Sequence, residues 1–218
     1  MTKVFNFSKL SIQPWFVFLI AGLVGCVDSE NHVASVKDKP LIEVAERTIF
    51  IQPLNNVPNE YIELVEGQFL SRFSRVLVLD NINLNNRLMN ASHTRYRADS
   101  IIRFLRDKTP QNGVTVGLIC EDISTTKGAH KDWGVFGLGF RPGNSCVVSS
   151  YRLKGDNRLE KFGKVALHEV GHTSGLNHCP VRNCLMRDAE GKDHLDELKA
   201  FCDRCKFKLL KTGWRLNP

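Results

Sequence analysis

The sequence predicts an α/β (α+β) fold, and three observations carry this prediction. The first half of the chain alternates short apolar runs with segments whose apolar residues recur at helical spacing, as in strands joined by helices. A hairpin pattern follows, and after it comes one further segment of helical spacing, residues 158–173. The 218 residues are enough for one domain with a substantial core, so these elements are expected to pack together.

The alternation in the first half predicts a right-handed α/β layer. Three apolar runs are expected to be strands: residues 48–52, 75–79 and 114–120. The run at 75–79 is continuously apolar, which predicts a buried parallel strand. Two segments are expected to be helices: residues 59–73, with Asn59 capping the start, and residues 96–108.

The second half of the chain has a different texture. Residues 135–140 and 145–153 flank the turn Arg141-Pro142-Gly143-Asn144 and predict a β-hairpin. Beyond Gly175 no strong strand signal remains, and the last helical pattern covers residues 195–211.

The most specific signal in the chain is the metal-binding pattern HExxHxxGxxH, which begins at His168. Side chains four residues apart lie on one face of a helix, so His168 and His172 can bind one ion. Glu169, beside them, is placed to take a proton from water at that ion. Gly175 can adopt the left-handed conformation that ends a helix, so the chain can turn back and bring His178 to the same ion.

Three neutral imidazoles would leave a zinc ion its full double charge and one open coordination position. Such an ion brings the pKa of bound water to about 7, which makes a hydroxide-like nucleophile available at neutral pH. The motif therefore predicts a hydrolytic zinc site.

Cysteines and a methionine complete a longer signature after the third histidine. Cys179 follows that histidine directly, Cys184 and Met186 come next, and Cys202 and Cys205 form a CxxC pair. The order HExxHxxGxxHC, CxxxxCxM and CxxC resembles the archaemetzincins, a small branch of the metzincin zinc peptidases.

This resemblance covers roughly residues 48–208 and is strongest from Val135 onward. It implies a metzincin (zincin-like) fold: a mixed twisted sheet with an antiparallel edge strand, an active-site helix and a small zinc-stapled C-terminal subdomain. By resemblance, residues 146–153 take the place of the edge strand at the rim of the cleft, where an extended peptide could add as another strand. An ordinary hairpin that covers the core is the alternative. Met186 corresponds to the methionine of the Met-turn, which lies beneath the catalytic zinc and is not a ligand.

Four cysteines form a set whose paired short spacings suit a closed, tetrahedral structural zinc: Cys179, Cys184, Cys202 and Cys205. Such an ion would fix His178 through its neighbour Cys179 and would replace part of the core that a loop-rich segment lacks. Two disulfides are the alternative in an oxidising compartment. Cys120 and Cys146 could pair with each other or remain buried thiols.

Residues 1–25 have the features of a targeting segment. Lys3 and Lys9 precede an apolar stretch of eleven residues, Trp15 to Gly25, which is too short to span a bilayer. The stretch ends in Leu23-Val24-Gly25-Cys26, which resembles the bacterial lipobox and predicts lipid attachment at Cys26. A plain secretory signal is the alternative. The protein is then expected in the bacterial cell envelope, lipid-anchored to a membrane outside the cytoplasm.

The expected organisation has four parts: a lipoprotein signal peptide at 1–25, a tether at 26–47, an N-terminal zincin subdomain at 48–175, and a C-terminal subdomain at 176–218. Removal of the leader lowers the formal charge from +7 to +5. No basic run interleaved with aromatic residues appears, so no nucleic-acid partner is expected, and we expect a monomer. The densest basic group predicts a solvated helix face: Arg95, Arg97, Arg103 and Arg106.

These observations together predict a membrane-anchored, zinc-dependent metallopeptidase that uses two Zn²⁺ ions, one catalytic and one structural. Its substrate would be a peptide or protein, with Glu169 as the general base that later passes its proton to the leaving amine. The alternative is a catalytically weak or inactive peptide-binding surface lipoprotein with a zincin fold. An intact Glu169 argues against it, because a binding protein has no need of a base beside the metal. A zinc hydrolase acting on a non-peptide amide would keep the chemistry and change the substrate.

Overall fold

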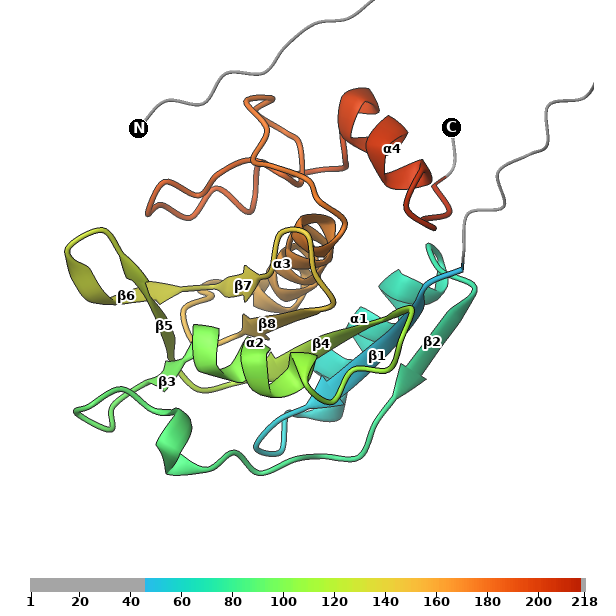
Figure 1. Ribbon diagram of the computed structural model, residues 1–218. Coiled ribbons are helices and arrows are strands. Elements are labelled where there is room, and N and C mark those ends of the chain that lie inside the picture. Colours follow the sequence, from blue (N-terminus) through green and yellow to red (C-terminus); the bar gives the residue numbers. More distant parts are fainter. Residues whose placement is uncertain (1–45, 217–218) are drawn as a thin grey trace, which may run out of the picture. The chain divides into compact units, whose positions relative to one another are not determined.

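The computed structural model describes residues 46–216 (Figure 1). The predicted leader, Cys26 and the tether up to residue 45 lie outside the described residues. Within the described part, no helix is long and apolar enough to cross a membrane.

The main sheet has five strands in the order β2-β1-β4-β8-β7. Their bounds are Thr48–Pro53 (β1), Arg75–Val78 (β2), Gly113–Ile119 (β4), Gly137–Gly139 (β7) and Ser145–Ser149 (β8). The first four strands in this order are parallel, and β7 pairs antiparallel with β8. The predicted mixed sheet with an antiparallel edge strand is therefore confirmed.

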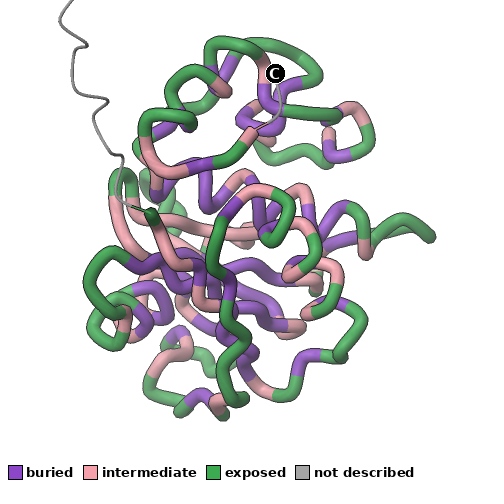
Figure 2. The backbone as a smooth tube through the Cα atoms, turned by 90° about the vertical axis from the view of Figure 1, so that its right-hand side faces the viewer, coloured by how far each residue is buried: buried purple, intermediate pink, exposed green. Residues whose placement is uncertain are grey.

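Helices cover both faces of this sheet (Figure 1). Helix α1 (Asn59–Leu70) and helix α3 (Arg158–Thr173) pack against each other on one face, and α2 (Ala98–Arg106) lies against β4 and β8 on the other. Two apolar clusters match these layers: the larger includes α1, α3 and the C-terminal segment, and the smaller surrounds α2. Figure 2 shows the buried residues concentrated in the interior and the exposed ones on the outer loops.

A second, three-stranded sheet has the order β3-β5-β6, with β3 at Tyr96–Arg97, β5 at Ile123–Lys127 and β6 at His130–Val135. The sequence patterns did not predict the β5–β6 hairpin. Its strands are mostly polar, and only two of their eleven residues are buried, so they lack the apolar alternation that marks a strand packed on a core. A short 3₁₀ helix, η1 (Asn86–Leu88), precedes this sheet.

The antiparallel edge strand is β7 and not residues 146–153, which corrects the assignment made from the resemblance. Residues 145–149 form β8, whose five residues are all buried between β4 and β7. Both arms of the hairpin are short and apolar, so the local pattern does not reveal which arm finds a parallel neighbour. That choice is made by a distant strand, β4, which pairs with β8 along five residue pairs.

Three other expectations differ from the structure. Strand β2 is an edge strand, not a buried one: Leu77, Val78 and Leu79 are 37–41% exposed. Helix α1 begins at Asn59, but Pro58 is the N-cap residue and no side chain caps the helix. The last helix, α4 (Asp203–Leu210), starts eight residues later than predicted. Residues before it turn and then extend beside Cys184, where Ala200 forms a β-bridge, so that Cys202 can reach the other cysteines.

Candidate metal centre

The site is built on α3, which the sequence placed at the same residues. Eleven of its sixteen residues are buried, because the helix lies between the sheet and the C-terminal segment. Gly171 permits this closeness: a Cβ there would lie 2.5 Å from the Met186 sulfur. Met186 is fully buried against the side of the helix that carries the histidines. Met186 thus packs against the helix next to His172, and its role beneath a bound zinc remains a prediction.

The three histidines of the motif converge on one point. The Nε2 atoms of His172 and His178 are 3.2 Å apart, and the ligand atoms of all three imidazoles lie within 4.8 Å of one another. Nitrogens about 2.0–2.1 Å from one tetrahedral ion are about 3.3 Å apart, so this spacing fits a metal. Gly175 makes the convergence possible, because its φ of +86° ends α3 and reverses the chain toward His178.

Each imidazole is oriented through its other ring nitrogen. The Nδ1 of His168 is 2.6 Å from the Leu185 carbonyl oxygen, and the Nδ1 of His172 is 2.8 Å from that of Leu176. The Nδ1 of His178 is 3.0 Å from a carboxylate oxygen of Asp188. With Nδ1–H donating to these oxygens, the Nε2 lone pairs point at the shared centre, as metal-binding histidines require.

Sequence reasoning missed Asp188. It lies in a polar segment ten residues after His178, and nothing in the local pattern distinguishes it from other acidic loop residues. A backbone N–H of Glu190 donates to the carboxylate and holds its pKa below the ordinary value, with the nearby His178 as a further cause. Asp188 is therefore an ionised acceptor for His178 Nδ1–H.

Burial also sets the protonation states of the site. Desolvation lowers the pKa of His168 to about 3 and that of His172 to about 4, so both imidazoles are neutral at pH 7. Desolvation raises the pKa of the Glu169 carboxyl to about 8. Neutral imidazoles are the form that binds a cation, and a cation beside Glu169 favours its ionised form.

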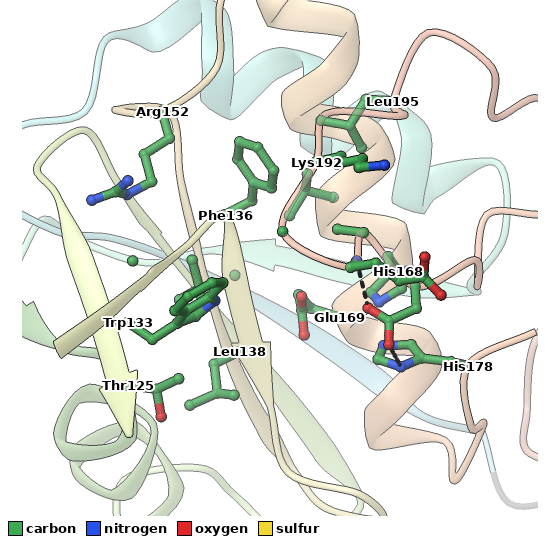
Figure 3. Close-up of a pocket in the computed structure, with 18 of the residues that line it drawn as sticks. Thr125, Trp133, Phe136, Leu138, Arg152, His168, Glu169, His178, Lys192 and Leu195 are labelled. Atoms are coloured by element: carbon green, nitrogen blue, oxygen red, sulfur yellow. Dashed lines mark hydrogen bonds and ion pairs between the residues drawn. The ribbon is translucent and has the colours of Figure 1, made fainter. Parts of the chain in front are cut away.

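Glu169 is packed against β7. A Cβ on Gly137 would lie 2.7 Å from its Cγ, and one on Gly139 would lie 2.9 Å from its backbone oxygen. These glycines let the edge strand approach the carboxylate closely, with Glu169 between β7 and the imidazoles (Figure 3). Gly137 and Gly139 line one cleft of about 950 Å³. The same cleft contains Glu169, the three histidines, Trp133 and Arg152.

The four C-terminal cysteines form a second cluster. Their sulfur atoms all lie within 4.8 Å of one another, with 3.7 Å between Cys179 and Cys202 and 3.8 Å between Cys184 and Cys205. Four sulfurs about 2.3 Å from one tetrahedral ion are about 3.8 Å apart, whereas a disulfide bond is about 2.05 Å long. The spacing fits a metal and not two disulfides.

Hydrogen bonds to sulfur offset part of the cost of burying thiolates in this cluster, although burial still raises the pKa of Cys184 and of Cys205. The backbone N–H groups of Met186 and Cys202 point to the Cys184 sulfur at 3.5 and 3.4 Å, and Arg204 donates to the Cys179 sulfur at 3.6 Å. Burial alone would raise the pKa of Cys179, but hydrogen bonds from the Val181 backbone and from neighbouring side chains lower it to about 7.

Cys120 and Cys146 do not belong to either site, and their placement excludes a bond between them. Cys146 is opposite Val116 in the β4–β8 register, while Cys120 lies four residues further along the β4 chain. At about 3.3 Å per residue this offset is roughly 13 Å, well beyond the Cα separation that a disulfide allows. The two residues are separate thiols.

A mixed sheet beneath a helix with three convergent imidazoles and a buried carboxylate defines the class of zinc-dependent peptidases. The family model described as Peptidase family M54 matches residues 75–211. The chain therefore belongs to the archaemetzincin family, peptidase family M54, and is a zinc-dependent metallopeptidase.

Individual relatives agree with this assignment. The archaemetzincin of Archaeoglobus fulgidus is 34% identical over 166 residues, which are 74% of this chain and 98% of that protein. Its crystal structure, complexed with malonate, has a TM-score of 0.62 at 32% identity and covers 74% of this chain and 99% of that one. The archaemetzincin structure from Methanopyrus kandleri has a TM-score of 0.66 at 26% identity, over 78% and 98% of the two chains.

The position of Asp188 leads to a first testable prediction. Asp188→Ala removes the acceptor that orients His178, so zinc affinity at the catalytic site is expected to fall by about 10- to 100-fold while the fold is retained. Competition with a chelator of known affinity measures this change. Glu190→Ala, two residues away and exposed, is the matched control. Unchanged zinc affinity in Asp188→Ala would show that His178 is held in place without this contact.

Proposed function

We propose that His168, His172 and His178 hold the catalytic zinc and that Glu169 is the general base of peptide-bond hydrolysis. One observation carries the proposal: three Nε2 atoms converge beside a single buried carboxylate inside an open cleft. The donor set fits zinc, because three neutral nitrogens leave an open coordination position. When bound, zinc supplies positive charge that polarises a substrate carbonyl and lowers the pKa of water.

The chain's own contribution to the chemistry is proton transfer at Glu169. Its carboxylate accepts a proton from the attacking water and then passes that proton to the nitrogen of the leaving amine. Contact with β7 prevents the side chain from moving away from the reacting atoms, since Gly137 and Gly139 pack directly on it. Burial excludes bulk water, which would otherwise exchange with the transferred proton.

We further propose that the substrate binds as an added strand along β7. This strand ends the main sheet and pairs only with β8 among the described residues, so one of its edges is available. Backbone N–H and C=O groups along that edge can pair with an extended peptide. The peptide bond beside Gly137 and Gly139 would then lie next to Glu169.

For the second cluster we propose a structural zinc held by Cys179, Cys184, Cys202 and Cys205. The closed set of four thiolates leaves no coordination position for substrate. Three of the four sulfurs belong to buried residues, and they lie where α4 joins the core. An ion there would tie the segment after Cys179 to the segment before α4.

Metal stoichiometry tests both sites together. Protein purified without added metal is expected to contain two zinc ions per chain, and Cys184→Ser is expected to lose the structural ion first. Elemental analysis combined with a free-thiol assay measures this. One zinc together with two disulfides per chain would rule out the structural site.

The proposed roles of Glu169 and His172 predict different effects when each residue is substituted. Glu169→Gln keeps the shape of the side chain but removes the base, so peptide hydrolysis should fall by about 10²-fold or more with zinc content unchanged. His172→Ala removes one of three ligands, so its first effect should be loss of zinc. Rates on a peptide library and zinc content of both variants provide the measurement. Hydrolysis by Glu169→Gln at the wild-type rate would exclude Glu169 as the base.

We propose, finally, that the protein is a lipoprotein attached at Cys26. The support is the sequence alone: an apolar stretch behind two lysines, ending in Leu23-Val24-Gly25-Cys26. The enzyme would then act at a membrane surface in the cell envelope.

Lipid attachment at Cys26 predicts that wild-type protein partitions into detergent and that Cys26→Ser does not, because the variant lacks the acylated thiol. Phase partitioning, with mass spectrometry of the mature N-terminus, makes the comparison. Cys120→Ser, which changes a cysteine of the folded domain, is the control. An unmodified Cys26, or a mature start elsewhere, contradicts the proposal.

A further inference from the structure

More lysine and arginine side chains than acidic side chains line the cleft around the histidines. Six lysines and arginines line it: Lys127, Arg141, Arg152, Lys154, Arg187 and Lys192. Two of these are ion-paired, Arg152 with Asp122 and Arg187 with Glu197, each at 2.7 Å. Each carboxylate is shared with a second arginine outside the cleft, so the pairs cancel only part of the charge. The other four have no ion-pair partner among residues 46–216.

The acidic residues of the cleft do not balance these cations. Glu169 is buried at the centre, and Asp188, the ionised acceptor of His178, contributes one negative charge near Lys127. Among the lining residues this leaves Glu190 as the one exposed carboxylate without such a role. A bound cation at the imidazoles would add further positive charge.

The arginines on the surface near α2 show the opposite arrangement. Arg95, Arg97 and Arg103 each form an ion pair with an aspartate, at distances of 2.7 to 3.4 Å. These pairs reduce the positive charge of the group, but Arg95 and Arg97 lie before α2, so the four arginines do not form the solvated helix face that the sequence predicted. In the cleft, by contrast, four of the six cations have no such partner among the described residues.

Three of the four unpaired cations, which come from separate segments, lie toward the two ends of β7. Arg141 is two residues past the end of β7, in the turn to β8, and is one of the charged groups near His172. Lys127 lies at the other end, with its Nζ 5.1 Å from the ring centroid of Trp133, four residues before β7 begins. Gly191 contacts the same tryptophan, which places the segment carrying Lys192 at this end of the cleft.

From this arrangement we infer that the cleft selects acidic peptides, with Arg141 contacting a carboxylate on one flank of the scissile bond and Lys127 with Lys192 contacting one on the other. This inference rests on the proposed function and names its substrate class. A peptide strand on β7 would place its reacting bond beside Glu169, so the selected side chains lie about two to four residues from that bond. The cations are exposed, so each contact is weak and selectivity comes from their sum.

The test uses the full-length zinc-loaded protein and peptides that share one cleaved core found in a random library. Positions two to four on either side of the core carry Glu, Gln or Lys. The kcat/KM for Glu-flanked peptides is expected to exceed that for Lys-flanked ones by on the order of tenfold, mainly through KM, since the contacts are remote from the reacting atoms. Raising the ionic strength from about 0.05 M to about 0.5 M should reduce this ratio.

Charge-reversal variants separate the two flanks. Arg141→Glu should abolish the preference for Glu on one flank only, and Arg141→Lys should retain it. The double variant Lys127→Glu with Lys192→Glu should abolish the preference on the opposite flank. Lys199→Glu, which changes the charge equally on an exposed residue outside the cleft, should leave both preferences intact. The inference is wrong if Arg141→Glu and the double lysine variant lose the preference for Glu on the same flank. It is also wrong if neither variant loses this preference.

A binding measurement tests charge selectivity independently of peptidase activity. Calorimetric titration of Glu-flanked and Lys-flanked peptides into the Glu169→Gln protein reports affinity without turnover. If wild type cleaves no peptide, the proposed function fails, and the order of affinities still decides the question of charge. Equal affinity, or equal kcat/KM, for acidic and basic peptides would refute selection of acidic substrates.

Discussion

The burial of α3 on two sides is the constraint on which the rest of the structure depends. One side of the helix packs on the sheet, and the other is covered by the segment that carries Met186 and the cysteines. Two layers can approach one helix this closely only where side chains are absent, as at Gly171 below Met186 and at Gly137 beside Glu169. The same burial lowers the pKa of His168 and His172, so both are neutral at pH 7, and raises the pKa of the Glu169 carboxyl.

The sequence predicted which histidines the structure brings together, because most of the motif is local. His168, Glu169 and His172 lie within one helical turn or so, and a single glycine determines whether His178 can join them. Hydrogen-bond acceptors that come from other segments of the chain were harder to predict from the sequence. The orienting acceptor of His178 is a lone aspartate in a polar loop, and two other acceptors are backbone carbonyls, which carry no sequence signal.

The same distinction explains the errors in the fold. The order of helices and strands followed from periodicity, but the pairing of β7 and β8 with their neighbours did not, because pairing depends on β4, about thirty residues away. The β5–β6 hairpin was missed for a related reason: beyond Ile123 and Val135 it packs little apolar surface, and most of it forms a wall of the cleft. Elements that shape the substrate site are therefore those that a search for buried faces detects least well.

The two metal clusters are joined through consecutive residues, and this junction accounts for their separate roles. Successive side chains of an extended chain point in opposite directions, so His178 faces the open cleft while Cys179, which is 3% exposed, faces the sulfur cluster. The backbone N–H of Cys179 donates to the Met186 carbonyl at 2.8 Å, which closes the segment that passes under α3. Since α3 supplies only two imidazoles, the third depends on how firmly this short segment is held. An ion among the four sulfurs would fix this segment at Cys179, and Asp188 would fix the His178 side chain. The cysteine site would then help to set the geometry of the histidine site without contacting substrate.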